Sequence, residues 1–319
     1  MMVWPKSLKN TGNKYFTKSF SVVTEYRLLY IYYMRSQATI KYLFALTLYG
    51  TIGLFLHYIS YSSEFVVLCR GTIGSLFILF VLLLRKKKID LDSIKKNLKF
   101  LAISGFALGF NWVFLFAGYR YGIAVSSLCN YLAPIIVVLI STIIYKEKIN
   151  RKQICCIVMA FIGMLLLTGI FETDNSSDIR CVIYGSLAAL GFVILVLCNK
   201  KIEGIEDLEK TLMQLFFSVL IVFPYVLFND GFPKQFDLQS TILVLILGIL
   251  HTGIAYICYF GSINVLDAQT IAVLGYLEPA LNFFIGAFVL KEKISASGII
   301  GAIMILFASI GNELSANKE

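Results

Sequence analysis

Ten runs of mostly apolar residues follow one another along this sequence, and each is close to the length that crosses a lipid bilayer. About 20 mostly apolar residues in a helix cross the roughly 30 Å of hydrocarbon, where only helices or closed barrels satisfy their backbone polar groups. The runs have the length of helices rather than of barrel strands. We therefore expect an all-α integral membrane protein with ten transmembrane helices.

The expected spans form two sets of five. The first set lies near Ile40–Ser60, Phe65–Leu84, Leu98–Tyr119, Ile123–Tyr145 and Ile154–Phe171. The second set lies near Ile179–Cys198, Leu212–Phe228, Ile242–Ile263, Ala268–Leu290 and Ile294–Gly311. The seventh span shows the pattern least clearly, because it is short and contains Gln214 and Pro224.

Composition and charge agree with a membrane protein. Apolar residues make up 58% of the chain, charged residues 15%, and the mean hydropathy is +0.81, all far from the averages of soluble proteins. The net charge of +9 comes from basic clusters beside apolar runs, which favours lipid contact over nucleic-acid binding. If both termini are cytoplasmic, 22 of the 28 basic residues lie on the cytoplasmic side and 5 outside. We therefore expect a multi-pass protein of the cytoplasmic membrane with both termini inside.

Residues 1–37 differ from the rest of the chain. They carry six basic residues among polar and aromatic ones, and they lack the apolar core and cleavage site of a secretory signal. We expect a basic extension on the membrane surface. An internal translation start at Met34 is the alternative interpretation.

One segment of the chain recurs at a spacing of 145 residues. Residues 131–134, Tyr-Leu-Ala-Pro, recur as Tyr-Leu-Glu-Pro at 276–279, and Lys-Glu-Lys-Ile at 146–149 recurs at 291–294. Eight of the nineteen positions in 131–149 are identical in 276–294, and apolar composition alone does not align a proline with a charged helix end. Each copy contains five spans, an odd number, so the second copy must enter the membrane in the opposite sense. Inverted repeats of this kind recur in transporters, whose substrate site lies at the repeat interface near the midplane.

These features resemble the EamA family of the drug/metabolite transporter superfamily. The resemblance rests on the two five-span halves, on an arginine early in the second span, and on the repeated proline and Lys-Glu-Lys-Ile motifs. It assigns residues 38–171 and 179–312 to two EamA-like repeats and leaves the amino-terminal extension outside them. It implies transport, mostly export, of amino acids, nucleosides or related metabolites across a bacterial inner membrane.

Glu278 is the most unusual residue of the ninth span, because it lies about 15 Å of helix from the start of that span, near the bilayer centre. An acid at that depth is costly unless it faces a polar cavity, forms a pair or is protonated. The functional interpretation is a group that couples transport to protons or binds a substrate amine. The structural interpretation is a protonated or hydrogen-bonded acid in a helix break. Its counterpart in the first copy is Ala133, so the acid breaks the repeat symmetry.

The two repeated prolines predict a kink at equivalent points of spans four and nine, since proline removes a backbone hydrogen bond and exposes carbonyl groups. Pro134 continues a polar stripe formed by Ser126 and Asn130, and Pro279 lies beside a stripe that contains Gly275, Glu278 and Asn282. Two polar stripes at matching depth on repeat-related helices favour a central cavity.

Further candidates are weighed against packing roles. The membrane histidine His251 is either a proton relay or an interhelical hydrogen-bonding group. Asn111 and Trp112 lie at mid-depth in the third span, where they face a ligand or surround the contact made by Gly105 and Gly109. The repeat-related Tyr131 and Tyr276 suit stacking on an organic substrate and equally suit packing.

Several charged residues are expected to be structural. Arg70 lies about 9 Å into the second span, near enough to the interface for its long side chain to reach it. A pairing with Glu64 or with an acid in a cavity is the alternative. Glu147 and Glu292, flanked by lysines at helix ends, are expected to be interfacial.

The leading hypothesis is a secondary transporter that works by alternating access around a midplane site. The sequence lacks a nucleotide-binding loop of the Walker type and the common hydrolase motifs, and its two histidines and seven cysteines lack metal-site spacing. We expect no catalytic activity, metal or cofactor, and the expected partners are a small-molecule substrate, membrane lipid and coupled protons. The alternatives are a non-transporting sensor or assembly protein and a membrane-embedded enzyme. Either a monomer or a homodimer is compatible with the sequence.

Overall fold

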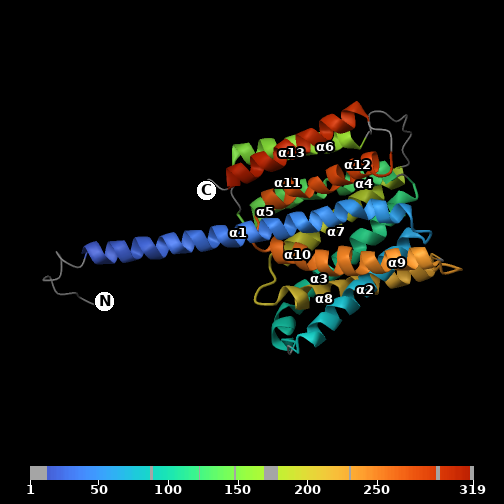
Figure 1. Ribbon diagram of the computed structural model, residues 1–319, viewed down its shortest axis with the longest axis horizontal. Coiled ribbons are helices and arrows are strands. Elements are labelled where there is room, and N and C mark those ends of the chain that lie inside the picture. Colours follow the sequence, from blue (N-terminus) through green and yellow to red (C-terminus); the bar gives the residue numbers. More distant parts are fainter. Residues whose placement is uncertain are drawn as a thin grey trace.

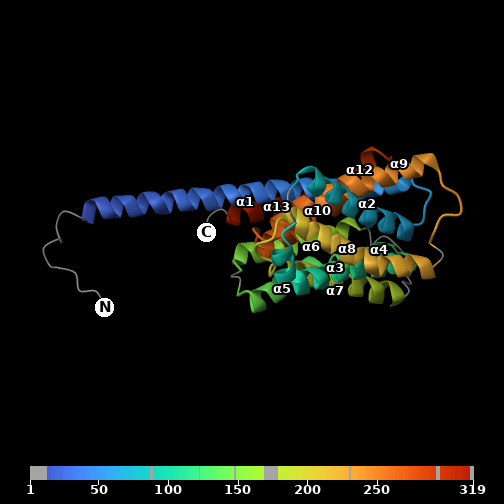
Figure 2. The ribbon, with the colours of Figure 1, turned by 90° about the horizontal axis from the view of Figure 1, so that it is seen from below.

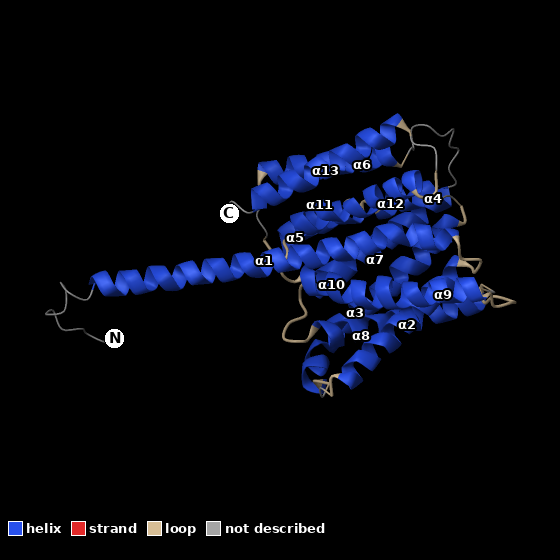
Figure 3. Ribbon diagram, in the orientation of Figure 1, coloured by secondary structure: helices blue, strands red, loops and turns tan. Residues whose placement is uncertain are grey.

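The computed structural model describes residues 13–86, 89–121, 123–146, 149–168, 179–229, 231–291 and 295–316. Within these residues the chain forms helices joined by short turns, without a strand among them (Figure 3). Glu147 and Glu292, expected to be interfacial, lie outside the described residues. The all-helical architecture predicted from the apolar runs is confirmed.

The helices follow the order of the predicted spans (Figure 1). The first half contains α1 (Asn13–His57), α2 (Ser63–Leu84), α3 (Leu91–Tyr119), α4 (Ile123–Asn130), α5 (Ala133–Ile144) and α6 (Arg151–Leu167). The second half contains α7 (Ile179–Asn199), α8 (Asp207–Phe228), α9 (Leu238–Ile246), the π-helix η2 (Leu247–Ile254), α10 (Ala255–Ile263), α11 (Ala268–Gly275), α12 (Leu277–Phe288) and α13 (Ala296–Ala316).

Among the described residues, eight helical spans are long and apolar enough to cross a bilayer. They are Tyr33–His57, Ser63–Leu84, Leu91–Tyr119, Val125–Ile144, Ile179–Asn199, Asp207–Phe228, Leu238–Ile263 and Ala268–Phe288. The predicted fifth and tenth runs fall on α6, which has 17 residues, and on α13, whose segment Ala296–Asn312 is a shorter apolar helix. The chain therefore passes through the membrane several times.

Helix α8 shows how side chains are distributed in the bundle. Its outer face carries four large apolar side chains that are about half exposed: Phe216 (49%), Leu220 (48%), Phe223 (49%) and Leu227 (54%). On its inner face the amide of Gln214 donates to the hydroxyl of Ser104 at 2.7 Å, and both residues are fully buried. Apolar side chains outside and a hydrogen bond between helices inside suit a lipid environment. The least clear of the predicted spans is thus a 22-residue helix that continues through Pro224.

Close helix contacts use small residues. A Cβ atom added at Gly105 or Gly109 of α3 would lie 2.6 Å from the carbonyl oxygen of Gln214 or Ser218 on α8, respectively. Only residues without a side chain allow the two backbones to approach this closely. The small-residue contact predicted for Gly105 and Gly109 is therefore confirmed as the packing surface between α3 and α8.

The amino-terminal segment joins the first span as one helix. α1 runs unbroken through the predicted boundary at residues 37 and 38, and its first part projects from the bundle (Figures 1 and 2). Where α1 enters the bundle, the guanidinium of Arg35 pairs with Asp267 at 2.9 Å, which caps the start of α11. The extension and the bundle thus share a continuous helix.

Spans four and nine are broken where the prolines predicted a kink. The predicted fourth span consists of α4, with 8 residues, and α5, with 12, and the predicted ninth span consists of α11 and α12 with the same two lengths. Pro134 and Pro279 lie in the first turns of α5 and α12, where a missing backbone N–H costs little. Each span therefore has a helix end in its middle, which is where polar backbone groups become available.

Candidate functional site

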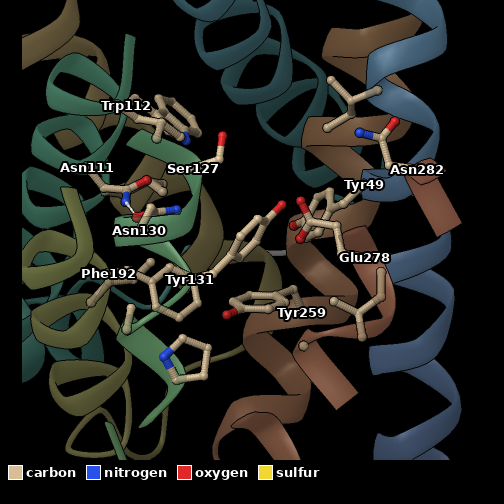
Figure 4. Close-up of a pocket in the computed structure, with 18 of the residues that line it drawn as sticks. Tyr49, Asn111, Trp112, Ser127, Asn130, Tyr131, Phe192, Tyr259, Glu278 and Asn282 are labelled. Atoms are coloured by element: carbon tan, nitrogen blue, oxygen red, sulfur yellow. Dashed lines mark hydrogen bonds between the residues drawn. The ribbon is translucent and has the colours of Figure 1, made fainter. Parts of the chain in front are cut away.

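A cavity of about 350 Å³ lies in the middle of the bundle, between the broken spans. One wall is formed by α3, α4 and α7, and the opposite wall by α1, α10 and α12 (Figure 4). Seven of the ten predicted site residues line it: Asn111, Trp112, Asn130, Tyr131, Pro134, Glu278 and Asn282. The volume is within the range of small-molecule sites.

Glu278 is the acidic residue of this cavity. Its side chain is half-buried, lies in the first turn of α12, and faces Tyr131 across the cavity (Figure 4). Among the described residues it has neither a hydrogen bond nor an ion pair through its side chain. The first turn of a helix stabilises a negative charge, because the backbone N–H groups there are unpaired. The carboxyl group is thus held at a helix start and remains available to a ligand or a proton.

The opposite wall carries an ordered amide pair. The Asn111 Nδ2 atom donates to the Asn130 Oδ1 atom at 2.9 Å and to the carbonyl oxygen of Ala188 at 2.8 Å. These bonds tie α3 to α4 and α7. The Asn130 amide nitrogen is left facing the cavity side of the pair (Figure 4). A nearby hydroxyl pair, in which Ser127 donates to Tyr119 at 3.2 Å, adds further polar atoms to the wall.

Four tyrosines that were not predicted form an aromatic cluster next to Glu278. The ring centroids of Tyr42 and Tyr259 are 5.3 Å apart, those of Tyr49 and Tyr256 are 5.4 Å apart, and all four residues line the cavity. In each helix the two tyrosines share a face, since they are separated by seven residues in α1 and by three in α10. That spacing is the signal that sequence reasoning could have used.

Arg70 has a different position from the one expected. It is buried, with 7% of its surface exposed, and it lines the cavity instead of reaching the interface. Its Nε atom donates to the hydroxyl of Thr252 at 3.1 Å, and its guanidinium lies 5.7 Å from the ring centroid of Trp112. The alternative partner, Glu64, instead pairs with Arg120 at 2.6 Å.

Three predicted site residues do not line the cavity. His251 is buried within η2, where its Nε2 atom lies 2.8 Å from the Thr51 hydroxyl. Tyr276 lies behind the wall and donates its hydroxyl to the carbonyl oxygen of Tyr131 at 2.9 Å, so it supports a lining residue. Pro279 is buried in α12. These three residues thus surround the site without facing its interior.

Comparisons with known proteins agree on the kind of protein. The model of the EamA-like transporter family matches residues 38–169 and 179–312. The chain is similar to an uncharacterized transporter, YxxF, of Bacillus subtilis (strain 168), with 29% identity over 275 residues that cover 85% of this chain and 88% of that protein.

Two further similarities extend the comparison. The S-adenosylmethionine uptake transporter of Rickettsia prowazekii (strain Madrid E) is 23% identical over 203 residues, which cover 60% of this chain and 65% of that protein. A crystal structure that is 18% identical in sequence superposes with a TM-score of 0.74 and covers 88% of this chain and 98% of the other. The similarity to the solved structure shows that the fold is shared.

Proposed function

Because the chain belongs to the EamA-like transporter family, we propose that it is a secondary transporter that exports a small organic metabolite across the cytoplasmic membrane. The substrate classes are amino acids, nucleosides or related compounds. The observation that carries the proposal is the cavity of about 350 Å³ between two broken spans, with an unpaired acid, Glu278, in its wall. A midplane cavity built from helix ends is the usual substrate site of secondary transporters.

Two inverted five-helix repeats would explain the positions of these breaks. α4 and α11 begin at Ile123 and Ala268, 145 residues apart, which is the spacing of the sequence repeat. The shorter helices α6 and α13 pack against each other at one edge of the bundle (Figure 1), and if both cross the membrane, they and the eight long spans would make up the ten expected helices. An inverted arrangement would place the cavity on a pseudo-twofold axis.

The packing around the cavity supports alternating access. α5 packs against α11, and the hydroxyl of Tyr276 bonds to the Tyr131 carbonyl on that side, whereas α4 and α12 make no contact of comparable extent. Under the proposed symmetry α4 corresponds to α11 and α5 to α12. The alternative state would therefore join α4 to α12 and separate α5 from α11.

Proton coupling is assigned to Glu278 in this proposal. An unpaired carboxyl group in a membrane cavity can exchange its proton with either side as access alternates. Protonation removes the charge before the closed intermediate forms, so the acid crosses between states without an uncompensated negative charge.

Flux through the purified full-length protein tests the proposal. Proteoliposomes are offered amino acids, nucleosides and cationic organic compounds with and without an imposed pH gradient. We expect the accumulation of at least one compound, dependent on the gradient and absent from empty liposomes. Glu278→Gln is expected to lose accumulation, while Glu64→Gln, an acid paired with Arg120 outside the cavity, retains it. A compound that is chemically converted, or a protein that moves none of them, contradicts the proposal.

A further inference from the structure

Arg70 is the second charged group in the wall of the cavity, and the proposed function makes no use of it. It comes from α2, is 7% exposed, and borders the same space as Glu278. Arginine stays protonated at any physiological pH, so this cation cannot be neutralised by losing a proton. A buried charge of this kind needs a counter-charge or strong hydrogen bonds.

The described residues supply only a small part of what Arg70 requires. A guanidinium has five N–H donors, and one of them, on Nε, goes to the Thr252 hydroxyl. Trp112 lies 5.7 Å away and provides its ring face, which holds the cation without using a donor. No N···O distance of 4.0 Å or less joins Arg70 to a described acid, including Glu278. The terminal nitrogen atoms of the fork therefore remain available to the cavity.

The position of Arg70 is fixed by the irregular helix η2. Within η2 the Thr252 hydroxyl donates to the Leu247 carbonyl, five residues earlier, at 3.1 Å. The same oxygen accepts from the Arg70 Nε atom, which fixes the angle at which the guanidinium meets the cavity. A π-helical turn is uncommon and is often found beside a functional site.

We propose that Arg70 is a specificity-determining residue that binds a carboxylate of the transported solute. Glu278 then faces the ammonium group of the same solute, and the aromatic rings contact its body. The substrate class is a zwitterion with an apolar or aromatic body, in preference to a nucleoside or a simple organic cation. This proposal rests on the proposed function, because it names the solute that the same cavity would carry.

The opposite charges of Arg70 and Glu278 support the choice of a zwitterion. A guanidinium fork matches the two oxygen atoms of a carboxylate, and hydrogen bonds between charged groups are about twice as strong as neutral ones. A simple cation would leave Arg70 without a counter-charge and would bring a second positive charge into the cavity. A zwitterion supplies a carboxylate to Arg70 and an ammonium group to Glu278, and it leaves the net charge of the cavity unchanged.

Binding and flux are measured on matched compounds. The probes are phenylalanine, phenethylamine, which lacks the carboxylate, and 3-phenylpropionate, which lacks the ammonium group, together with the corresponding leucine-derived set. The chain has two tryptophans, Trp4 and Trp112, so Trp4→Phe leaves a single reporter that lines the cavity. Its fluorescence measures binding in detergent, and proteoliposomes measure flux.

We expect a zwitterion from at least one set to bind more tightly than its amine and its acid. Arg70→Gln should lower the affinity for the zwitterion by about 10- to 100-fold, as expected for a lost charged hydrogen bond. It should lower the affinity for the matched amine much less. Arg70→Lys should restore part of the preference, because it keeps the charge but loses the fork. Arg120→Gln, an arginine that pairs with Glu64 and does not line the cavity, is the matched control and should keep the preference.

Two results overturn the assignment of Arg70. One is equal weakening of zwitterion and amine in Arg70→Gln, which a purely structural arginine would give. The other is a nucleoside or simple cation that is transported while no zwitterion binds, in which case the proposed function stands and the zwitterion class fails. A third result is a Trp112 fluorescence change that reports zwitterion binding, without flux of any compound. It would support the assignment of Arg70 as the carboxylate-binding residue and contradict the proposed transport.

Discussion

The two broken spans, α4–α5 and α11–α12, differ in side chains although their helix lengths match. The first span brings Ser127 and Asn130 to the cavity from α4, while the second brings Glu278 and Asn282 from α12. Strict symmetry would place the partners of the α4 residues on α11, yet the cavity residues of α11 are Ile271 and Gly275. The backbone break is thus repeated, whereas the polar chemistry is not.

The unequal distribution of polar residues in the two broken spans bears on which of their helices pack together. Both polar sets lie on α4 and α12, which are the two pieces that stay apart, and apolar residues dominate where α5 and α11 pack. Polar side chains that face a cavity keep water, and apolar ones close by packing. The asymmetry of the two copies therefore favours the state observed here, and exchanging residues between the copies tests this idea.

The largest effect is expected from Glu278→Gln. Removing the titratable group should abolish accumulation driven by a pH gradient, because the residue no longer carries a proton. Exchange of labelled for unlabelled solute at equal pH should persist at saturating solute, since the cavity and its helix start remain, although the lost charge should lower the affinity for a solute with an ammonium group. The two assays on the same proteoliposomes separate coupling from binding. Full accumulation by this variant would exclude Glu278 as the coupling group.

Placing an acid at the equivalent position of the first copy should destabilise the protein. Ala133 is 1% exposed in α5 and borders the cavity, so Ala133→Glu adds a larger side chain and a second acid to a buried part of the cavity wall. Overpacking alone costs about 1–3 kcal/mol, and an unpaired charge adds to it. Thermal unfolding in detergent measures the loss, with Ala133→Ser as the control of smaller volume. A stable variant with active transport would show that the two copies are interchangeable at this position.

The comparison also shows what the sequence made predictable. The helix breaks followed from Pro134 and Pro279, and the cavity position of Glu278 and Asn130 followed from the polar stripes beside them. These are local features that lie on single helices, so a repeating pattern of about 3.6 residues per turn is enough to place them on one face.

Other parts of the site depend on how helices are rotated against one another. Tyr42 and Tyr259 are separated by more than 200 residues in sequence and meet only because α1 packs on α10. His251 was weighed as a proton relay or as an interhelical hydrogen-bonding group, and it lies inside the π-helix η2, whose hydrogen-bonding pattern gives its side chains other directions than an α-helix would. Arg70 was expected to reach the interface, but its Nε atom instead donates to Thr252. Thr252 lies in the same irregular helix, whose geometry the sequence pattern does not reveal.

A moderate effect is expected from Asn130→Ala. It removes one bond of the amide pair, while Asn111 keeps its bond to the Ala188 carbonyl. The loss of a neutral hydrogen bond is worth about 0.5–1.5 kcal/mol, so solute affinity should fall by about 2- to 12-fold. Gly275→Ala is the matched control at the equivalent position, because its added Cβ would lie 3.6 Å from the Tyr42 hydroxyl, an ordinary contact. An equal loss in both variants would indicate that solute affinity responds to any change in the cavity lining.

The smallest effect is expected from the repeat-related tyrosines. Tyr276→Phe removes the hydrogen bond to the Tyr131 carbonyl, which joins the two broken spans where α5 and α11 pack. Its loss should shift the equilibrium by about 2- to 12-fold toward the state in which these helices separate, as expected for a bond of about 0.5–1.5 kcal/mol. Spin-label distances between α5 and α11 measure the populations.

Tyr131→Phe is the matched control, since the Tyr131 hydroxyl points into the cavity and makes no hydrogen bond to a described residue. It should leave the distance distribution between α5 and α11 unchanged while altering the surroundings of Glu278. If Tyr131→Phe shifts the populations and Tyr276→Phe does not, the hydrogen bond between the repeats does not hold the observed state. The polar residues of α4 and α12 would then determine the preference on their own, because they would keep their side of the cavity hydrated without help from the opposite contact.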